Sequence, residues 1–205
     1  MLDEPLGSLD RVLRESLQVQ VRAILKEVGV TAIYVTHDRE EAFAIADIIV
    51  VMDQGSIVQG GPPAALFAEP VSELVARSLG LRNIFPGTVV RNEKPVEVRS
   101  PIGTLIASTL RTTQDVGADV LLLIDERGVF ISLSALGRDP EATVLLGVVE
   151  ARSFHGGETE LAVRVGDGLL RCLVAAKDPG SHTQVGDKVS ILVPPEAVRF
   201  TPRRV

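Results

Sequence analysis

The chain has 205 residues, of which 45% are hydrophobic and 23% are charged, a composition typical of globular domains. Acidic residues outnumber basic ones, 27 to 21, which gives a net charge of −6. Because neither half carries a basic patch, we expect no direct binding to nucleic acid or to anionic lipid. No apolar run approaches the ~20 residues that span a bilayer, and the N-terminus has no secretory pattern. We therefore expect a cytosolic protein.

The beginning of the chain predicts the end of a buried strand, followed by one long helix. Met1 to Glu4 read as the last residues of the strand. Asp10 occupies an N-cap position and Gly29 a C-cap position. Apolar residues between them recur at spacings of three and four, which places them on one helix face. These residues are Leu13, Leu17, Val21, Ile24, Leu25 and Val28.

Helices and strands then alternate up to about residue 85. Residues 30–35 are β-branched and apolar and predict a buried strand. Asp38 and Glu41 have the spacing of a capping box, which predicts a short helix to about Ala46. The remaining predictions are a hairpin of residues 48–52 and 56–59 around Asp53-Gln54-Gly55, a helix from Pro63, and a helix over 71–79. This succession predicts an α/β layer with a mostly parallel sheet.

After about residue 86, short strands alternate with turn residues, which predicts a small barrel or sandwich. An internal repeat runs through this part, because residues 116–124 match residues 185–193 at an offset of 69. Residues 128–132 match residues 197–201 at the same offset. We expect two similar units of about 60 residues that share one core. The single cysteine, Cys172, lies in an alternating strand pattern and is expected to be a packed thiol.

Asp3 and Glu4 are adjacent carboxylates at the predicted end of a buried strand. One such carboxylate can bind a divalent cation, and the other can orient or deprotonate a water. Residues 2–10 closely resemble the Walker B end and D-loop of ABC-type ATPases, usually written LDEPLSALD, and match seven of those nine positions. Residues 34–42 match the H-loop of the same family, and residues 46–63 resemble the hairpin that follows it.

The resemblance covers residues 1–85 and implies a partial P-loop NTPase fold that acts on ATP and Mg²⁺. It implies that Asp3 holds Mg²⁺ through water and that Glu4 is the general base for the attacking water. It also implies that His37 contacts the γ-phosphate and that Asp10 reaches across the interface with a second ATPase subunit. The partners implied are that second subunit and transmembrane permease subunits. The protein would then lie at the inner face of the plasma membrane.

Other motifs of that family do not occur in the sequence. There is no G-x-x-x-x-G-K-[ST] loop, no Q-loop segment and no L-S-G-G-Q signature. In the family these motifs precede the position of Asp3, so Met1 would stand within the Walker B strand. We therefore expect a C-terminal fragment of an ATPase subunit that is inactive on its own.

Residues 86–205 resemble the paired OB-like regulatory domain, called TOBE, that follows the ATPase in one class of importer. Residues 83–89 resemble the entry to that domain, and residues 195–198 match the R-P-E-x-V motif of its second unit except that Pro194 replaces the Arg. The resemblance implies uptake of ferric iron, with polyamine or sulfate as alternatives, and a small regulatory ligand at the TOBE domain. Residues 99–105 look most like the ferric-iron branch.

Two other readings of the chain stay open at this point. The first is a free-standing β module that binds a small oxyanion or a regulatory protein. The second is a degenerate fragment without activity. The D-loop and H-loop matches in residues 1–85 argue against a pure binding module.

Overall fold

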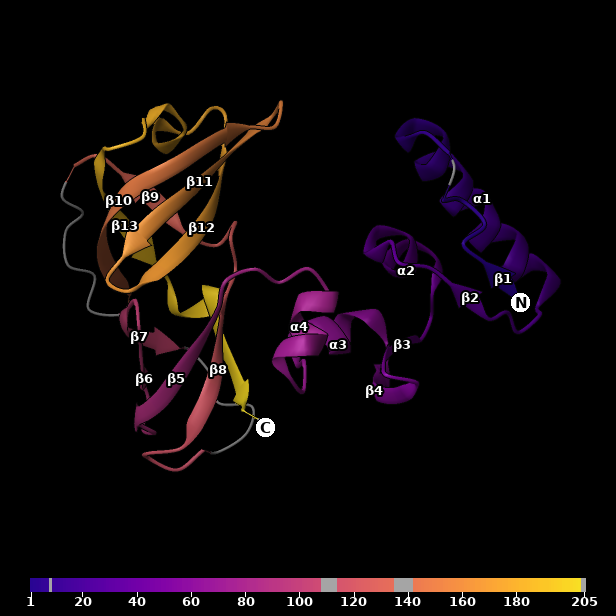
Figure 1. The fold of residues 1–205 in the computed structure, drawn as a ribbon, viewed down its shortest axis with the longest axis horizontal. Helices are drawn as coiled ribbons and strands as arrows, with labels where there is room; N and C mark the ends of the chain where they lie inside the picture. Colours follow the sequence, from indigo (N-terminus) through magenta and orange to yellow (C-terminus); the bar gives the residue numbers. More distant parts are fainter. Residues whose placement is uncertain (8, 108–113, 135–141, 204–205) are drawn as a thin grey trace. The chain divides into compact units, whose positions relative to one another are not determined.

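A computed structural model describes residues 1–7, 9–107, 114–134 and 142–203 of the chain (Figure 1). The chain divides into two compact units, Met1–Pro70 with Ser78–Gly80, and Val71–Arg77 with Leu81–Val205. In the part of the chain that the structure describes, no helix is both long enough and apolar enough to cross a membrane. The helices and strands of residues 1–80 are β1 (Leu2–Asp3), α1 (Arg11–Val28), β2 (Tyr34–Val35), α2 (Arg39–Ile45), β3 (Ile49–Asp53), β4 (Ser56–Gly61), α3 (Pro63–Ala68) and α4 (Glu73–Ser78).

Helix α1 begins and ends where the capping residues predict. Asp10 accepts a hydrogen bond from the backbone N–H of Leu13 at 3.0 Å. Gly29 adopts the left-handed conformation, with φ of 68°, and its N–H bonds to Leu25. The predicted apolar face is only partly packed, however, because Leu13, Ile24 and Val28 are exposed while the other three residues are half-buried. The capping residues therefore mark the ends of this helix, while half of its apolar face remains exposed within the unit.

The prediction of a buried strand over residues 30–35 is wrong. The strand β2 comprises only Tyr34 and Val35, and Val30 and Ile33 are exposed. Its partner in the sheet is the two-residue strand β1, to which it runs parallel. A partner of two residues supplies no ladder for residues 30–33, so apolar composition alone does not make them a strand.

The helix α2 and the hairpin β3–β4 confirm their sequence signals. Asp38 caps α2 by accepting hydrogen bonds from the N–H groups of Glu40 and Glu41. In the hairpin, Gln54 and Gly55 both have positive φ, 47° and 79°. A two-residue turn with this geometry matches the twist of the two strands that it joins.

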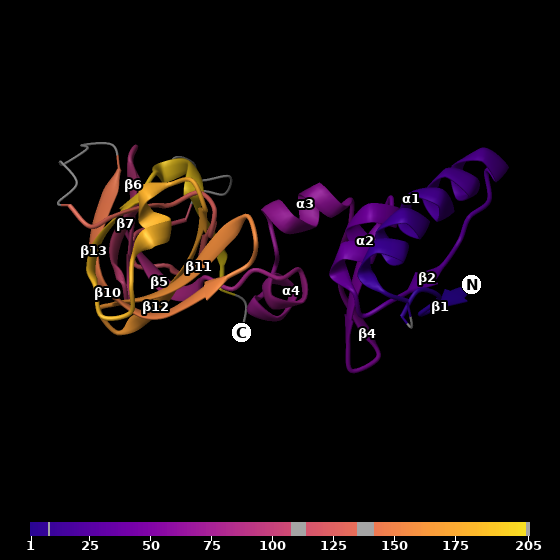
Figure 2. The same cartoon turned by 90° about the horizontal axis from the view of Figure 1, so that it is seen from above.

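The C-terminal unit consists of two five-stranded sheets (Figures 1 and 2). One sheet has the order β14-β8-β5-β6-β7 and the other the order β12-β11-β10-β13-β9. The strands and short helices are β5 (Ile84–Arg91), β6 (Val96–Ser100), β7 (Gly103–Ala107), β8 (Asp119–Ile124), β9 (Phe130–Ser132), β10 (Thr143–Phe154), β11 (Glu158–Val165), β12 (Gly168–Ala175), η1 (Pro179–His182), β13 (Lys188–Val193), η2 (Pro195–Ala197) and β14 (Val198–Pro202).

The two sheets exchange their last strands, which explains the internal repeat. Ile131 of β9 pairs with Ile191 in the second sheet, and Phe200 of β14 pairs with Leu122 in the first. Both residues of one pair lie 69 positions from their counterparts in the other pair, which is the offset of the repeat. Each repeat unit is therefore completed by a strand of the other, and the two sheets enclose one apolar core.

Two buried polar or polarisable side chains lie in or beside this core, Cys172 and Asn83. Cys172 is fully buried in it, which confirms the packed thiol, and burial raises the pKa of that thiol. Buried Asn83, just before β5, donates a hydrogen bond to the carbonyl of Arg171 at 2.7 Å and accepts one from its N–H at 2.8 Å. The two bonds join the beginning of a strand in one sheet to β12 in the other. Loss of the Asn83 amide would leave a buried backbone pair unsatisfied.

We predict a large difference in amide hydrogen exchange between the two units. Strands β8 and β13 lie between paired neighbours and contribute fully buried residues to the core, so their amides should exchange slowly. Residues 1–70 have short strands and exposed apolar side chains, so their amides should exchange faster. Native-state exchange followed by mass spectrometry tests this. Equal or reversed protection would contradict the packing described here.

Candidate functional site

The candidate site lies at the carboxyl ends of the parallel strands β1 and β2. The backbone N–H of Leu2 donates to the carbonyl of Ile33 at 2.8 Å, and that of Glu4 to the carbonyl of Val35 at 2.9 Å. The register places Asp3 opposite Val35. Because the strands run parallel, the residues that follow them emerge at the same edge of the sheet.

Glu4 and His37 meet at this edge. His37 Nδ1–H donates a hydrogen bond to Glu4 Oε1 across 2.9 Å, since an ionised carboxylate can only accept. Both side chains remain accessible, with 54% of Glu4 and 76% of His37 exposed. The hydrogen bond from His37 to Glu4, reinforced by the negative charge of Glu4, raises the pKa of His37 above its ordinary value. The pair is therefore an imidazole that donates a hydrogen bond to a carboxylate, with both side chains exposed to solvent.

The backbone turns sharply at Glu4. Its φ of 42° lies in the left-handed region, which side chains other than glycine adopt at a cost of roughly 1–3 kcal/mol. The turn lets the N–H of Gly7 bond to the carbonyl of Glu4 at 3.2 Å. Strained backbone of this kind is concentrated at functional sites. Glu4 therefore combines an unfavourable conformation with an exposed, hydrogen-bonded carboxylate.

The other two predicted site residues have separate positions. Asp3 is the exposed last residue of β1, directly before Glu4. The carboxylate of Asp10 is engaged in capping α1. Within the described residues, no group of three or more His, Cys, Asp or Glu side chains is arranged to hold a metal ion. The structure thus brings Glu4 and His37 together, and it leaves the metal role of Asp3 and the interface role of Asp10 as predictions.

The sequence reasoning missed the polar network beneath the pair. Glu41 was expected to complete a capping box, but its carboxylate points inward and accepts hydrogen bonds from the hydroxyls of Tyr34 and Thr36, both at 2.9 Å. Arg14 of α1 contacts this network at Asp38 and Glu41. The hydroxyls of Tyr34 and Thr36 were the available signal, because they flank the end of β2 with the spacing of one strand face.

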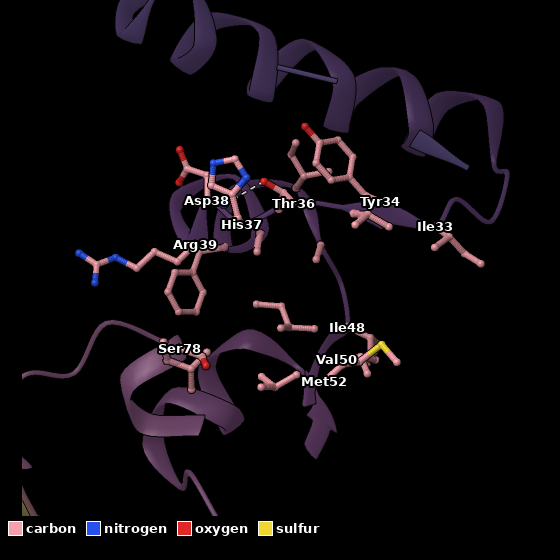
Figure 3. Close-up of a pocket in the computed structure, with 18 of the residues that line it drawn as sticks. Ile33, Tyr34, Thr36, His37, Asp38, Arg39, Ile48, Val50, Met52 and Ser78 are labelled. Carbon is pink, nitrogen blue, oxygen red and sulfur yellow. Dashed lines mark hydrogen bonds between the residues drawn. The ribbon is translucent and has the colours of Figure 1, made fainter. Parts of the chain in front are cut away.

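A cavity of about 740 Å³ adjoins the site within the N-terminal unit (Figure 3). Figure 3 shows His37, Asp38 and Arg39 at one end of it and the side chains of Ile48, Val50 and Met52 farther along. The walls are mostly apolar, and Ser78 and Leu79 also line it. The polar groups of the site therefore border an apolar hollow.

The fold of the C-terminal unit agrees with a known family. A sequence profile of the TOBE domain matches residues 129–200. The solved structure of the cytoplasmic molybdate-binding protein ModG aligns with a TM-score of 0.52 over 60% of this chain and 97% of that chain, at 19% identity. At this identity the likeness concerns the fold alone. The C-terminal unit is an OB-like β domain of the TOBE type.

Relatives of known name extend the match to most of the chain. The spermidine/putrescine import ATP-binding protein PotA of Haemophilus ducreyi is 30% identical over 93% of this chain and 53% of its own length. The protein of the same name from Thermobifida fusca is 36% identical over 82% of this chain and 43% of its own length. The Fe(3+) ions import ATP-binding protein FbpC of Streptomyces avermitilis is 53% identical over 43% of this chain and 26% of its own length.

These matches agree with the D-loop, H-loop and TOBE resemblances. Over most of its length the chain is similar to the ATP-binding subunits of importers, and its residues 129–200 match the TOBE domain. It spans about half the length of the curated relatives that it matches.

We predict that Glu4→Gln lowers the pKa of His37. The substitution removes the negative charge that stabilises the imidazolium. Because the pKa of His37 is raised in the folded unit, the pair contributes stability at low pH and loses it as pH rises through that pKa. NMR titration of the His37 ring measures the change. Glu15→Gln is the control. This substitution also removes one negative charge, but Glu15 pairs with Arg11 on α1. A His37 pKa that is the same in both variants would contradict the pairing.

Proposed function

We propose that this chain forms part of the ATP-hydrolysing subunit of an ABC importer and that Glu4 and His37 act together at its catalytic site. The observation that carries the proposal is the hydrogen bond between the two side chains at the carboxyl ends of adjacent parallel strands. In open α/β sheets, ligands bind outside the carboxyl ends of the strands. The names of the relatives supply import as the process and ATP as the nucleotide.

In this proposal Glu4 accepts a proton from the water that attacks the γ-phosphate. Its carboxylate is exposed and is carried by the backbone turn that directly follows β1. His37 holds the carboxylate through Nδ1, which leaves its Nε2 available. When the ring is protonated, Nε2–H can donate to a phosphate oxygen. The raised pKa of His37 extends that protonated form to higher pH.

Asp3 would hold Mg²⁺ in the same proposal. Mg²⁺ is usually bound by one or two carboxylates together with water and substrate phosphate oxygens. A single exposed carboxylate next to the general base fits this donor set, and no larger protein cluster is needed. The ion would offset the charge that develops on the phosphate oxygens.

The domain boundaries belong to the proposal as well. Residues 1–85 would be part of a P-loop NTPase domain of the ABC type, and residues 86–205 a tandem OB-like regulatory domain that binds a small ligand. Asp10 would contact a second ATPase subunit across a dimer interface, in addition to its capping role. Transmembrane permease subunits would be the other partners, which places the protein at the inner face of the plasma membrane.

For the imported solute we propose ferric iron, with polyamine as the alternative. A relative named for Fe(3+) import is 53% identical over 89 residues. Relatives matched over most of the chain are named for spermidine and putrescine, at 30–36%. Both solutes are cationic.

We predict that Glu4→Gln in a full-length subunit lowers ATP turnover by about 10²–10⁴-fold, the usual cost of losing a general base. The subunit can be built by joining this chain to the N-terminal half of a relative. ATP should still bind, since the phosphate-binding loop is unaffected. His37→Ala should act similarly. Steady-state turnover and nucleotide binding are the measurements.

Two controls accompany this experiment. The 205-residue chain by itself should hydrolyse no ATP above background, because its sequence contains no Gly-rich phosphate loop. Glu15→Gln should leave turnover of the full-length subunit unchanged, since Glu15 pairs with Arg11 on the surface of α1. Near-normal turnover in both Glu4→Gln and His37→Ala would remove them from the catalytic site.

A further inference from the structure

Arg14 of α1 makes polar contacts with both segments that carry the candidate pair. Its Nη2 donates to the carbonyl of Leu9 at 2.7 Å, and its Nε lies 3.5 Å from the carbonyl of Leu6. These carbonyls belong to the turn that follows Glu4. In addition, Arg14 Nη1 lies 3.4 Å from Asp38 Oδ2, and the same Nε lies 3.7 Å from Glu41 Oε1. A single planar guanidinium therefore joins the segment after Glu4 to the segment after His37.

Glu41 is the buried end of this contact. Only 2% of its side chain is exposed, against 27% for Arg14. Burying a carboxylate is costly unless it is paired and hydrogen-bonded. Arg14 supplies the charge, and the hydroxyls of Tyr34 and Thr36 supply the hydrogen bonds. These contacts hold the Glu41 carboxylate in place. Through the same contacts, Glu41 restrains Arg14, Tyr34 and Thr36.

Thr36 passes this constraint to His37. Its hydroxyl donates to Glu41 and also accepts a hydrogen bond from the backbone N–H of Asp38 at 3.0 Å. The residues on both sides of His37 are thus held by side-chain bonds. The imidazole itself stays exposed and meets only Glu4 in this network.

We infer that Arg14, acting with Glu41 and Thr36, is a positioning residue that sets the distance between Glu4 and His37. The network holds the turn after β1 and the turn after β2 in one arrangement. It thereby adds to the restraint that the pairing of the two short strands provides. The inference rests on the proposed function only for the task that it assigns to the pair. The arrangement itself is a property of this chain.

Charge and position predict opposite effects on His37, which allows a direct test. Arg14 is positive, so removing it should raise the pKa of the nearby imidazole if charge is all that matters. If Arg14 positions the pair, removing it should loosen the hydrogen bond to Glu4 and lower that pKa. The negative groups around His37 are Glu4, Asp38 and Glu41.

The experiment is NMR titration of the His37 ring in the 205-residue chain. We expect Arg14→Gln to lower the pKa of His37. Arg22→Gln is the matched control, because it removes the same charge from the same helix. Arg22 contacts the end of α2 and Asp47. It should leave the pKa of His37 unchanged. An increase, or no change, in Arg14→Gln would overturn the inference.

Thr36→Val keeps the inference testable if Arg14→Gln unfolds the N-terminal unit. It alters no charge and nearly preserves side-chain shape, but it removes the hydroxyl that bonds Glu41. We expect it also to lower the pKa of His37, and an unchanged pKa in this variant would overturn the inference. The titration involves no nucleotide, so its outcome is independent of whether Glu4 and His37 hydrolyse ATP.

Discussion

The candidate site depends on the parallel pairing of β1 with β2. Two backbone hydrogen bonds, from Leu2 to Ile33 and from Glu4 to Val35, define this pair of two-residue strands. A shift by one residue would reverse the faces of the strand and separate Glu4 from His37. So short a ladder is weak by itself, which gives the polar network around Arg14 and Glu41 its structural importance.

The C-terminal unit is stabilised differently, by the exchange of strands between its two repeat units. Each repeat unit has four strands of its own sheet and receives the fifth from the other unit. Neither sheet is complete without the exchanged strand, so both units share one core of buried aliphatic side chains. A domain of this size gains from a single larger core, since small cores bury a smaller fraction of their surface. The large buried core thus lies in the C-terminal unit, while the candidate site lies in the N-terminal unit, where more of the large apolar side chains are exposed.

Much of this could be predicted from local signals in the sequence. Asp10, Gly29 and Asp38 fix helix ends through bonds to nearby backbone, and Gly55 permits a turn. The repeat at an offset of 69 predicted two matching β units, because equivalent residues occupy equivalent positions. Family motifs indicated Glu4 and His37, and parallel pairing brings them together.

Other features could not be predicted because they depend on contacts distant in sequence. The prediction of a strand at residues 30–35 is wrong because the length of a strand depends on its partner strand. The composition of the segment does not reveal that partner. Glu41 has the spacing of a capping residue, yet the hydroxyls of Tyr34 and Thr36 and the charge of Arg14 draw it inward. The exchange of β9 and β14 cannot be read from the residues of these strands, because their patterns do not indicate which of the two sheets each strand joins.

The pairing of β1 with β2 can be measured directly as a scalar coupling across the hydrogen bond from the Glu4 amide to the Val35 carbonyl. The bond from the Ile124 amide to the Asn83 carbonyl, at 3.1 Å within the β domain, is an internal reference. If the two strands are paired as described, both couplings will be observed in the isotope-labelled chain. A coupling for Ile124 with none for Glu4, in spectra that resolve both amides, would mean that Glu4 and His37 are not held together by these strands.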